Sequence, residues 1–429
     1  MAEFKYRSAN EMKDSGVEWL GAIPEDWKMT RMKYNGESII GLTYAPEDVV
    51  DNNGSLVLRS SNVQNNKIDL NDTVYVSKKI PFKLITKEGD ILICSRNGSR
   101  ALIGKNAYID GASIGYTFGA FMTVFRSGQS RYIYYVFNSP LFSYQSSSYL
   151  TATINQLTVN NLNNFVTALP GPLEQQKIAN FLDIKTAQFD SIIAKKEQLI
   201  QKLEEAKKSL ISEVVTGKVK IVDGEMVRRQ PEEMKESGVE WLGMVPKEWE
   251  IKRIKHISQL RSGESITNES IEVEGHYPVY GGNGIRGYTD SYTHKGKHIL
   301  IGRQGALCGN INIANGDFWA SEHAVVVNIQ SDTNIIWFSL LLDSMNLNQY
   351  SISAAQPGLA VGMINNLFVP YTSREEQDLI SGYLEFESNK FAQLQVKILS
   401  QIQKLKQAKQ SLISEAVTGK IDLRDWNII

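Results

Sequence analysis

One stretch of sequence occurs twice and decides the fold: MKDSGVEWLGAIPEDWKMTRMK at residues 12–33 and MKESGVEWLGMVPKEWEIKRIK at residues 234–255. The two copies share 13 identities in 22 positions at an offset of 222. A second pair, KLEEAKKSLISEVVTGK at 202–218 and KLKQAKQSLISEAVTGK at 404–420, shares 13 identities in 17 positions at an offset of 202. Chance would give about one identity in each window, so the chain is a tandem duplication.

The repeated segments form a frame around two inserts, residues 34–168 and 256–368, which show no convincing alignment with each other. A repeated frame with divergent inserts indicates one scaffold that presents two different recognition modules. The predicted segments are 1–168, a repeat segment with the first module; 169–218, a long helix; 219–233, a linker; 234–368, a repeat segment with the second module; and 369–429, a second long helix and tail.

The frame also predicts two long helices. Residues 174–215 contain neither Pro nor Gly, and at about 1.5 Å per residue such a helix reaches about 63 Å. Each helix should stop at a Thr-Gly-Lys turn, at Thr216 and at Thr418. Apolar residues at 3,4 spacing predict a seam on each helix: Phe189, Ile192, Leu199, Leu203, Ala206 and Leu210, and then Phe391, Leu394, Ile398, Leu405, Ala408 and Leu412.

A helix with so many polar residues is only marginally stable by itself, so its apolar seam must pack against a partner. The other copy is the favoured partner, in an antiparallel pair that relates the halves by a pseudo-twofold axis. The alternative is that each helix packs separately on its own domain. Trp19, Trp27, Trp241 and Trp249 lie at matched places and are expected to pack the modules onto the frame, with base stacking as the alternative.

Both inserts read as α+β, with strands first and a helix later. In the first insert, the expected strands are 56–58, 73–76, 90–93 and 120–125, and the helix is 132–143. In the second insert, the expected strands are 277–280, 297–301 and 324–329, and the helix is 334–346.

The net charge of −1 over 429 residues excludes a polybasic protein that binds nucleic acid by bulk attraction. The first insert carries 11 basic and 9 acidic side chains, and the second carries 5 and 9. Two cysteines, Cys94 and Cys308, cannot form a disulfide framework. The start of the sequence does not resemble a signal peptide, and no apolar run is long enough for a membrane span. We therefore expect a cytoplasmic protein.

If the inserts bind DNA, a few well-placed polar groups must do so. Arg, Asn and Gln can bond bidentately to guanine or adenine edges. The alternative for each residue is a turn or a surface ion pair. The candidates are Arg59, Ser60, Asn62, Lys78, Lys79, Arg96, Asn97, Arg100 and Lys105 in the first insert, and Arg261, Asn283, Arg286, Lys295, Lys297, Arg303 and Gln304 in the second.

The enzyme motifs that occur in the sequence fail on their context. Gly282–Gly287 fits G-x-G-x-x-G, but no helix follows to hold a pyrophosphate. His294 and His298 lack the further ligands of a metal site. The chain also lacks the Asn-Pro-Pro-Tyr type of tetrapeptide with which adenine methyltransferases hold a flipped base. These observations predict a chain with no catalytic residues and no bound metal.

The combination of features resembles the specificity (S) subunits of type I restriction-modification enzymes. Ser-Gly-Val-Glu-Trp-Leu-Gly-x-x-Pro precedes each insert, at 15–24 and 237–246. Leu-Pro-x-Pro-Leu-Glu-Gln-Gln-Lys-Ile at 169–178 leads into the first helix, whereas its counterpart around 369–377 departs from that pattern. Asp-Phe-Trp-Ala-Ser-Glu-His-Ala at 317–324 resembles a stretch common in the recognition domains of that family.

The resemblance implies two target recognition domains, each reading one half of an asymmetric bipartite DNA target, separated by a long antiparallel two-helix coiled coil. It implies two modification subunits that dock on the helices and methylate adenine at N6 with S-adenosylmethionine. It further implies two restriction subunits that use ATP and Mg²⁺ for translocation and cleavage, with none of these cofactors bound by this chain. The competing hypotheses are a non-enzymatic coiled-coil scaffold joining two protein-binding modules, and a fused nuclease or methyltransferase.

Overall fold

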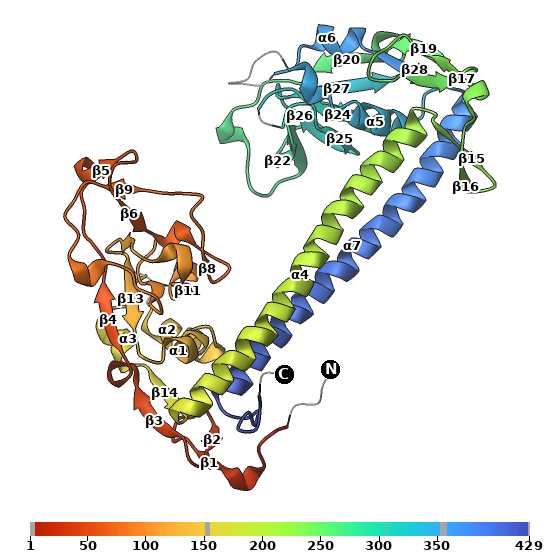
Figure 1. The fold of residues 1–429 in the computed structure, drawn as a ribbon. Coiled ribbons are helices and arrows are strands. Elements are labelled where there is room, and N and C mark those ends of the chain that lie inside the picture. The colour runs from red at the N-terminus through yellow and green to blue at the C-terminus, as the bar shows by residue number, and fades with distance from the viewer. Residues whose placement is uncertain (1–4, 151–154, 306, 352–357, 428–429) are drawn as a thin grey trace. The chain divides into compact units, whose positions relative to one another are not determined.

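The computed structural model describes residues 5–150, 155–305, 307–351 and 358–427 (Figure 1). The chain divides into two units: unit 1 comprises residues 1–196 and 400–429, and unit 2 comprises residues 197–399. Each unit holds one insert, one copy of the frame and half of each long helix. Both helices and strands are present in each unit, as the α+β prediction requires.

Two helices of 44 residues, α4 (Pro172–Val215) and α7 (Arg374–Val417), are the longest elements. The prediction of one long helix in each copy is confirmed. Both helices end at the expected turn, where Gly217 and Gly419 adopt φ angles of +73° and +70°. This left-handed conformation favours Gly at the end of a helix. Among the described residues, no helix combines the length and the apolar character needed to cross a membrane.

The buried side of each helix follows a regular 4,3 spacing, and the two copies match at an offset of 202. On α4 the buried or half-buried residues at this spacing are Leu182, Thr186, Phe189, Ile193, Lys196, Ile200, Leu203, Lys207, Leu210 and Val214. On α7 they are Leu384, Ser388, Phe391, Gln395, Ile398, Ile402, Leu405, Lys409, Leu412 and Ala416. We call these twenty residues the helix stripe.

Five residues of the predicted seam lie outside the helix stripe, so the prediction is wrong for them. Ile192, Leu199 and Leu394 are 45%, 44% and 48% exposed, and Ala206 and Ala408 are also exposed. Ile192 and Leu199 are each followed by another apolar residue, so either register fits a 3,4 pattern. The other three are followed by polar stripe residues, Gln395, Lys207 and Lys409, which an apolar pattern passes over. The other seam residues, Phe189, Leu203, Leu210, Phe391, Ile398, Leu405 and Leu412, lie in the stripe.

Polar side chains join α4 to α7 and give the direction of the pair. In unit 1, Lys409 Nζ lies 2.6 Å from Asp190 Oδ1, and Lys196 Nζ donates to Gln401 Oε1 at 2.7 Å. In unit 2, Gln395 Nε2 donates to Glu204 Oε1 at 3.1 Å. Partners on α7 thus fall in number as those on α4 rise, so the helices run antiparallel where they pack (Figure 1).

Each half of the frame contains a buried arginine that pairs with the first turn of its helix. In unit 1, Arg7 Nη2 donates to Glu174 Oε1, and Trp27 Nε1 donates to Glu174 Oε2 at 3.1 Å. The side chains of Arg7 and Glu174 are 1% and 12% exposed. Burial raises the pKa of the Glu174 carboxyl, and the charge of Arg7 opposes that shift. We call these three residues the unit 1 anchor.

Unit 2 repeats the anchor with residues at the repeat offsets. Arg229 Nη2 donates to Glu376 Oε1 at 2.7 Å, and Trp249 Nε1 donates to Glu376 Oε2 at 2.8 Å. Trp27 and Trp249 are almost fully buried, in agreement with the predicted packing role. The sequence that leads into α7 differs from the sequence that leads into α4. Glu376 nevertheless makes the same contacts as Glu174, so the anchor has the same geometry in both units.

The two anchors receive their arginines by different routes. In unit 2, a hairpin of β15 (Val219–Val222) and β16 (Glu225–Arg228) brings Arg229 back so that its N–H bonds Lys218 O at 3.1 Å. In unit 1, the equivalent segments are residues 5–7 and 420–422, and no hairpin joins them. There the N–H of Arg7 bonds Lys420 O at 3.0 Å, and the N–H of Asp422 bonds Lys5 O at 2.8 Å. Hydrogen bonds between the two ends of the chain therefore repeat the geometry that the hairpin provides covalently.

The frame strands pair in the same way in both units. In unit 1, β1 (Met12–Asp14) pairs with β2 (Ala22–Pro24), and β3 (Lys28–Arg31) pairs with β14 (Val166–Leu169), all antiparallel. In unit 2, β17 (Met234–Glu236) pairs with β18 (Met244–Pro246), and β19 (Glu250–Arg253) pairs with β28 (Phe368–Tyr371). Each insert therefore leaves and rejoins the frame through neighbouring strands, which carry it into the following long helix.

The first insert holds two four-stranded sheets. One has the order β11 (Asn106–Tyr108), β10 (Ile91–Cys94), β13 (Met122–Arg126), β4 (Glu37–Ile40), and the other has β12 (Thr117–Phe118), β6 (Ser55–Leu58), β9 (Tyr75–Val76), β5 (Val49–Val50). A small hairpin joins β7 (Val63–Gln64) to β8 (Lys67–Ile68). Three helices follow: α1 (Ser130–Phe137), α2 (Pro140–Tyr149) and α3 (Val159–Asn164). The single helix predicted over 132–143 is two, because Pro140 begins a new helix.

The second insert has the same plan. One sheet has the order β20 (Ser258–Ser262), β27 (Ala324–Ile329), β24 (His298–Gly302), β25 (Ile311–Ala314), and the other has β22 (Gly284–Thr289), β21 (Tyr277–Gly281), β26 (Asp317–Ala320), β23 (His294–Lys295). Helices α5 (Ile335–Ser344) and α6 (Val361–Asn366) follow. The main sheets of the two inserts have matching strand orders, and the parallel pairs β12–β6 and β26–β21 correspond. The second sheets differ in their fourth strand, because β5 lies beside β9 whereas β23 lies beside β26. The inserts therefore share a main sheet that their sequences do not reveal.

We predict that Arg7→Met destabilises the protein by about 3 kcal/mol, because it leaves the Glu174 carboxylate buried without its cation. The difference in free energy of unfolding between the wild type and the variant should become smaller as the pH falls from about 8 to about 5. The pKa of Glu174 is already raised, and the neutral acid, favoured at low pH, needs no cation. Urea unfolding at several pH values measures both effects.

Arg229→Met is the matched variant in unit 2 and should give a loss of similar size. A wild-type unfolding curve for both variants would contradict the anchoring role of these arginines.

Candidate nucleic-acid interface

Two equivalent sites lie where the central strands β10 and β24 end. Cys94 is opposite Met122 in one sheet, and Gly302 is opposite Ala324 in the other. Two residues after Cys94 and Gly302 stand Arg96 and Gln304, and one residue before Met122 and Ala324 stand Phe121 and His323. Arg96 therefore corresponds to Gln304 in the other insert, and Phe121 corresponds to His323. We call Arg59, Ser60, Ser95–Asn97, Lys105 and Phe121 the β10 edge, and Ser262, Arg303, Gln304, Glu322 and His323 the β24 edge.

Tight backbone packing occurs at the same position beside both edges. A Cβ atom on Gly41 would lie 2.2 Å from Gly119 O, and one on Gly263 would lie 2.3 Å from Ser321 O. The strand that enters each sheet therefore passes against the turn before β13 or β27. Glycine is required there because the carbonyl oxygens leave no room for a side chain.

Four of the residues predicted in the first insert meet around Ser60. Asn97 Nδ2 donates to Ser60 Oγ at 3.1 Å, and Lys105 Nζ donates to Ser60 O at 3.4 Å. The neighbouring Arg59 pairs with Asp72, with Nη2 lying 2.9 Å from each carboxylate oxygen. The sequence segments around Arg59 and Arg96 are thus brought to one edge by the sheet, although 37 residues separate Ser60 from Asn97.

Asn62 is not available to a ligand, and its prediction as a contact residue is wrong. Its side chain is fully buried, accepts from the N–H of Arg59 at 2.9 Å, and donates to Asp69 O and Asp72 O at 2.9 and 2.6 Å. An Asn that satisfies a turn in this way looks the same in sequence as one that reads a base.

The other basic candidates of the first insert do not bond to Ser60. Lys78 Nζ donates to Thr43 O at 3.2 Å and pairs with Asp48 at 3.3 Å, and Lys79 is exposed beside it. Arg100 Nη2 donates to Ser147 O at 3.3 Å, at the edge of α2.

The second insert brings Arg303 and Gln304 to the β24 edge. Arg303 Nη1 donates to Ser262 Oγ at 3.0 Å, next to Arg261, which is exposed at the end of β20. Gln304 Oε1 lies 2.8 Å from His323 Nδ1, and His323 Nε2 lies 3.3 Å from Glu322 Oε1.

The glycine-rich turn between β21 and β22 adds two exposed candidates. Asn283 accepts from Asn310 Nδ2 at 2.5 Å, and Arg286 Nη2 donates to Asn268 Oδ1 at 2.8 Å. β21 and β22 form an antiparallel hairpin, so a strand and not a helix follows the G-x-G-x-x-G segment, as expected from its rejection as a dinucleotide site.

Lys295 and Lys297 are not brought to the β24 edge. They precede β24, whereas Arg303 follows it, and a five-residue strand separates its ends by about 16 Å. Lys295 also pairs with Asp317 at 3.8 Å. Phe121 and His323 are edge residues that were not among the sequence candidates. A lone phenylalanine has no pattern, and His323 belongs to the 317–324 stretch, which indicated a family resemblance and not a contact.

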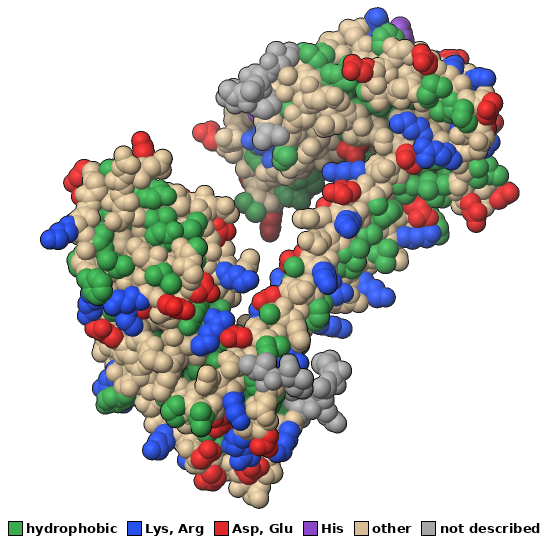
Figure 2. Space-filling model, viewed as in Figure 1, with side chains coloured by type: hydrophobic (Ala, Val, Ile, Leu, Met, Phe, Trp, Pro, Cys, Tyr) green, Lys and Arg blue, Asp and Glu red, His purple; other side chains and the backbone are tan. Residues whose placement is uncertain are grey.

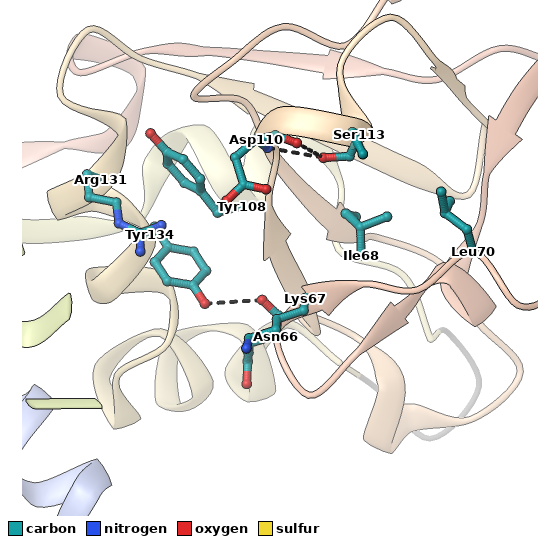
Figure 3. A pocket seen from close by; sticks show the side chains of 10 residues that line it. Asn66, Lys67, Ile68, Leu70, Tyr108, Asp110, Ser113, Arg131 and Tyr134 are labelled. Carbon is teal, nitrogen blue, oxygen red and sulfur yellow. Dashed lines mark hydrogen bonds between the residues drawn. The ribbon is translucent and has the colours of Figure 1, made fainter. Parts of the chain in front are cut away.

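A pocket of about 360 Å³ lies on the side of the first insert (Figure 3). The guanidinium of Arg131 lies 4.5 Å from the Tyr108 ring and 5.2 Å from the Tyr134 ring, and it pairs with Asp183 of α4 at 2.6 Å. Burial raises the pKa of Tyr134 to about 12, and its hydroxyl donates to Asn66 O at 3.2 Å. These groups satisfy one another and hold the insert on α4.

Charge is dispersed on the face drawn in Figure 2, where Lys and Arg alternate with Asp and Glu over both units. Among the residues that the structure describes, no three His, Cys, Asp or Glu side chains are grouped to hold a metal ion.

The comparisons with known proteins agree on one family. Residues 24–205 and 246–404 match the family described as type I restriction modification DNA specificity domain. The chain belongs to this specificity family. The two matches coincide with the two halves of the duplication.

Two curated members of the specificity family come from Escherichia coli. The type I restriction enzyme EcoprrI specificity subunit is 46% identical over 138 residues, which cover 31% of this chain and 34% of that protein. The EcoKI specificity subunit of strain K12 is 30% identical over 208 residues, covering 46% and 44%. The matched stretches thus span less than half of each relative.

A solved structure shows the fold of the specificity family over nearly the whole chain. It was solved in work on complex assembly and conformational transition of the type I R-M system, with a TM-score of 0.68. It covers 92% of this chain and 98% of that one at 14% identity, so the likeness is one of fold alone.

We predict that Asn62→Ala lowers the free energy of unfolding by about 1–3 kcal/mol, because it leaves buried backbone groups unpaired. Arg96→Ala, at an exposed position on the same edge, should change it by about 0.5 kcal/mol or less. Thermal unfolding of both variants tests the assignment. An Asn62→Ala protein as stable as the wild type would show that this side chain has no structural role.

Proposed function

We propose that this chain is the DNA sequence-recognition subunit of a type I restriction-modification complex. One observation carries the proposal: a duplicated frame presents two inserts whose main sheets have the same strand order but carry different side chains at the same edge. A duplicated binder of a single ligand would retain its contact residues in both copies. Different groups at equivalent places suit two different half-sites of an asymmetric bipartite DNA target.

The finer proposal is that the helix stripe forms an antiparallel coiled coil, which sets the spacer between the half-sites. Helices of 44 residues are about 66 Å long. Half-sites on one face of DNA lie about 34 Å apart or multiples of that distance. The continuous length of α4 and α7 therefore suits a spacer.

We also propose that the helices dock two copies of a methyltransferase subunit. Ile184 and Ile192 on α4 are 36% and 45% exposed, and their repeat equivalents on α7, Phe386 and Leu394, are 59% and 48% exposed. An apolar pattern that occurs once in each unit fits two copies of one partner. The complex would further include two restriction subunits.

In this proposal, the partners carry the chemistry, and this chain binds no S-adenosylmethionine, ATP or Mg²⁺. The duplicated segments and divergent inserts support a recognition role, whereas the sequence lacks a methyltransferase tetrapeptide. The competing function, a scaffold for two protein-binding modules, predicts no dependence on DNA sequence.

The testing experiment is to map N6-methyladenine in a host that expresses this chain with its methyltransferase partner. An asymmetric bipartite motif is expected, and Ile192→Glu in a folded chain should reduce methylation by weakening docking. The purified chain alone, given S-adenosylmethionine and Mg²⁺, should be inert. Turnover by the chain alone, or methylation without sequence preference, would contradict the proposal.

We predict that inserting one heptad after Gln198 in α4 and after Ser400 in α7, where repeat-equivalent positions face each other, lengthens the spacer and leaves the half-sites unchanged. Seven residues add about 10 Å, or about three base pairs at 3.4 Å each. Insertion in α4 alone should abolish methylation, because the helix stripe then loses its register. The same mapping reads all three chains, and altered half-site bases would disprove the spacer role.

A further inference from the structure

The two inserts differ in chemistry at one pair of equivalent positions. The sheet registers match Arg96 with Gln304 and Phe121 with His323. Backbone bonds support the match, because the N–H of Ser95 bonds Phe121 O and the N–H of Arg303 bonds His323 O. Isolated bridges also pair Arg96 with Gln156 and Gln304 with Gly358.

In unit 1, the pair is a cation held over an aromatic ring. The guanidinium carbon of Arg96 lies 5.0 Å from the centre of the Phe121 ring, and Phe121 is 58% exposed. The other arginines of the first insert bond through their guanidinium groups to Asp72, Ser147, Asp90 or Asp183. Of the described residues in that insert, Arg96 is the one arginine with no such partner, so its donors are available to a ligand.

In unit 2, the pair is an amide oriented by an imidazole. The separation of 2.8 Å between His323 Nδ1 and Gln304 Oε1 fits an N–H donor on the ring. Gln304 is exposed, and among the described residues its amide nitrogen donates no hydrogen bond. The contact with His323 restrains the Gln304 side chain at the β24 edge.

We propose that these two pairs, Arg96 with Phe121 and Gln304 with His323, are the specificity-determining contacts of the two half-sites. The proposal rests on the proposed function, since it names the groups that read DNA. Phe121 and His323 act as positioning residues that orient the reading side chains.

The chemistry of each reader selects a different base. An arginine bonds guanine O6 and N7, and a glutamine bonds adenine N6 and N7, each for about 10-fold discrimination or more. The first insert should therefore require a G·C pair at one position of its half-site. The second insert should require an A·T pair at the equivalent position.

The experiment exchanges the pairs within the full chain, expressed with its methyltransferase partner. In R96Q/F121H, the half-site of the first insert should change from G·C to A·T at one position, by about 10-fold or more, while the other half-site is unchanged. In Q304R/H323F, the second half-site should change in the opposite direction. Methylome mapping reads both half-sites at once.

A matched control is available in the segment that precedes β10. Lys87 Nζ lies 4.5 Å from the ring of the exposed Phe82, beyond the opposite end of β10. F82H/K87Q makes the same chemical change there and should leave both half-sites as in the wild type. If this control altered a half-site as R96Q/F121H does, the effect would not belong to the β10 edge.

The outcomes separate this proposal from the proposed function. Wild-type half-sites in both exchanged chains would overturn the pairs as readers and leave the proposed function intact. A wild-type complex that methylates no specific sequence would overturn the proposed function itself. Should a double variant fail to methylate any DNA, the single variants R96K and Q304N decide: each must weaken discrimination in its own half-site only, and an unchanged half-site overturns the proposal.

Discussion

The structure depends on the pairing of two copies of one helix. Residues at 4,3 spacing on α4 have their counterparts 202 positions later on α7, so a single stripe packs against its own repeat in the opposite direction. The stripe is only partly apolar, and Lys196, Lys207, Gln395 and Lys409 are among its members. Hydrogen bonds to groups of the opposite helix, such as Lys409 to Asp190, stabilise these polar positions and define the register.

The anchors connect that pairing to the inserts. Glu174 and Glu376 lie in the first turn of their helices and accept bonds from an arginine and a tryptophan of the frame. Each insert starts and finishes next to this group, through one pair of frame strands. Because the frame strands and contacts with the long helices, such as Arg131 with Asp183, hold the insert in place, the side chains at the strand ends are free to diverge, as the β10 and β24 edges have done.

The sequence predicted the frame well and the inserts less well, for physical reasons. The duplication and the absence of Pro and Gly determine the long helices, which end at Gly217 and Gly419 as expected. Five of the twelve seam residues were misplaced. Ile192-Ile193 and Leu199-Ile200 offer two apolar registers, and only the packing of the opposite helix selects one. At the other three positions the stripe residue is polar, so an apolar pattern selects its neighbour.

At the candidate site, composition suggested residue types but could not separate contact from support. Asn62 and Arg96 both looked suited to base recognition. The fold buries Asn62 under a turn and leaves Arg96 exposed over an aromatic ring. Phe121 and His323 are positioned by the turn before β13 and β27, a relation that exists only once the sheets have formed.

The hairpin formed by β15 and β16 has a consequence for how the halves find each other. The bonds between Lys5–Arg7 and Lys420–Asp422 make the same backbone connection without a covalent link, so what the hairpin adds to those bonds is the tether itself. What it supplies is a local concentration in the millimolar range for short tethers. A tether of this length therefore favours pairing between frame segments of one chain over pairing with those of another chain.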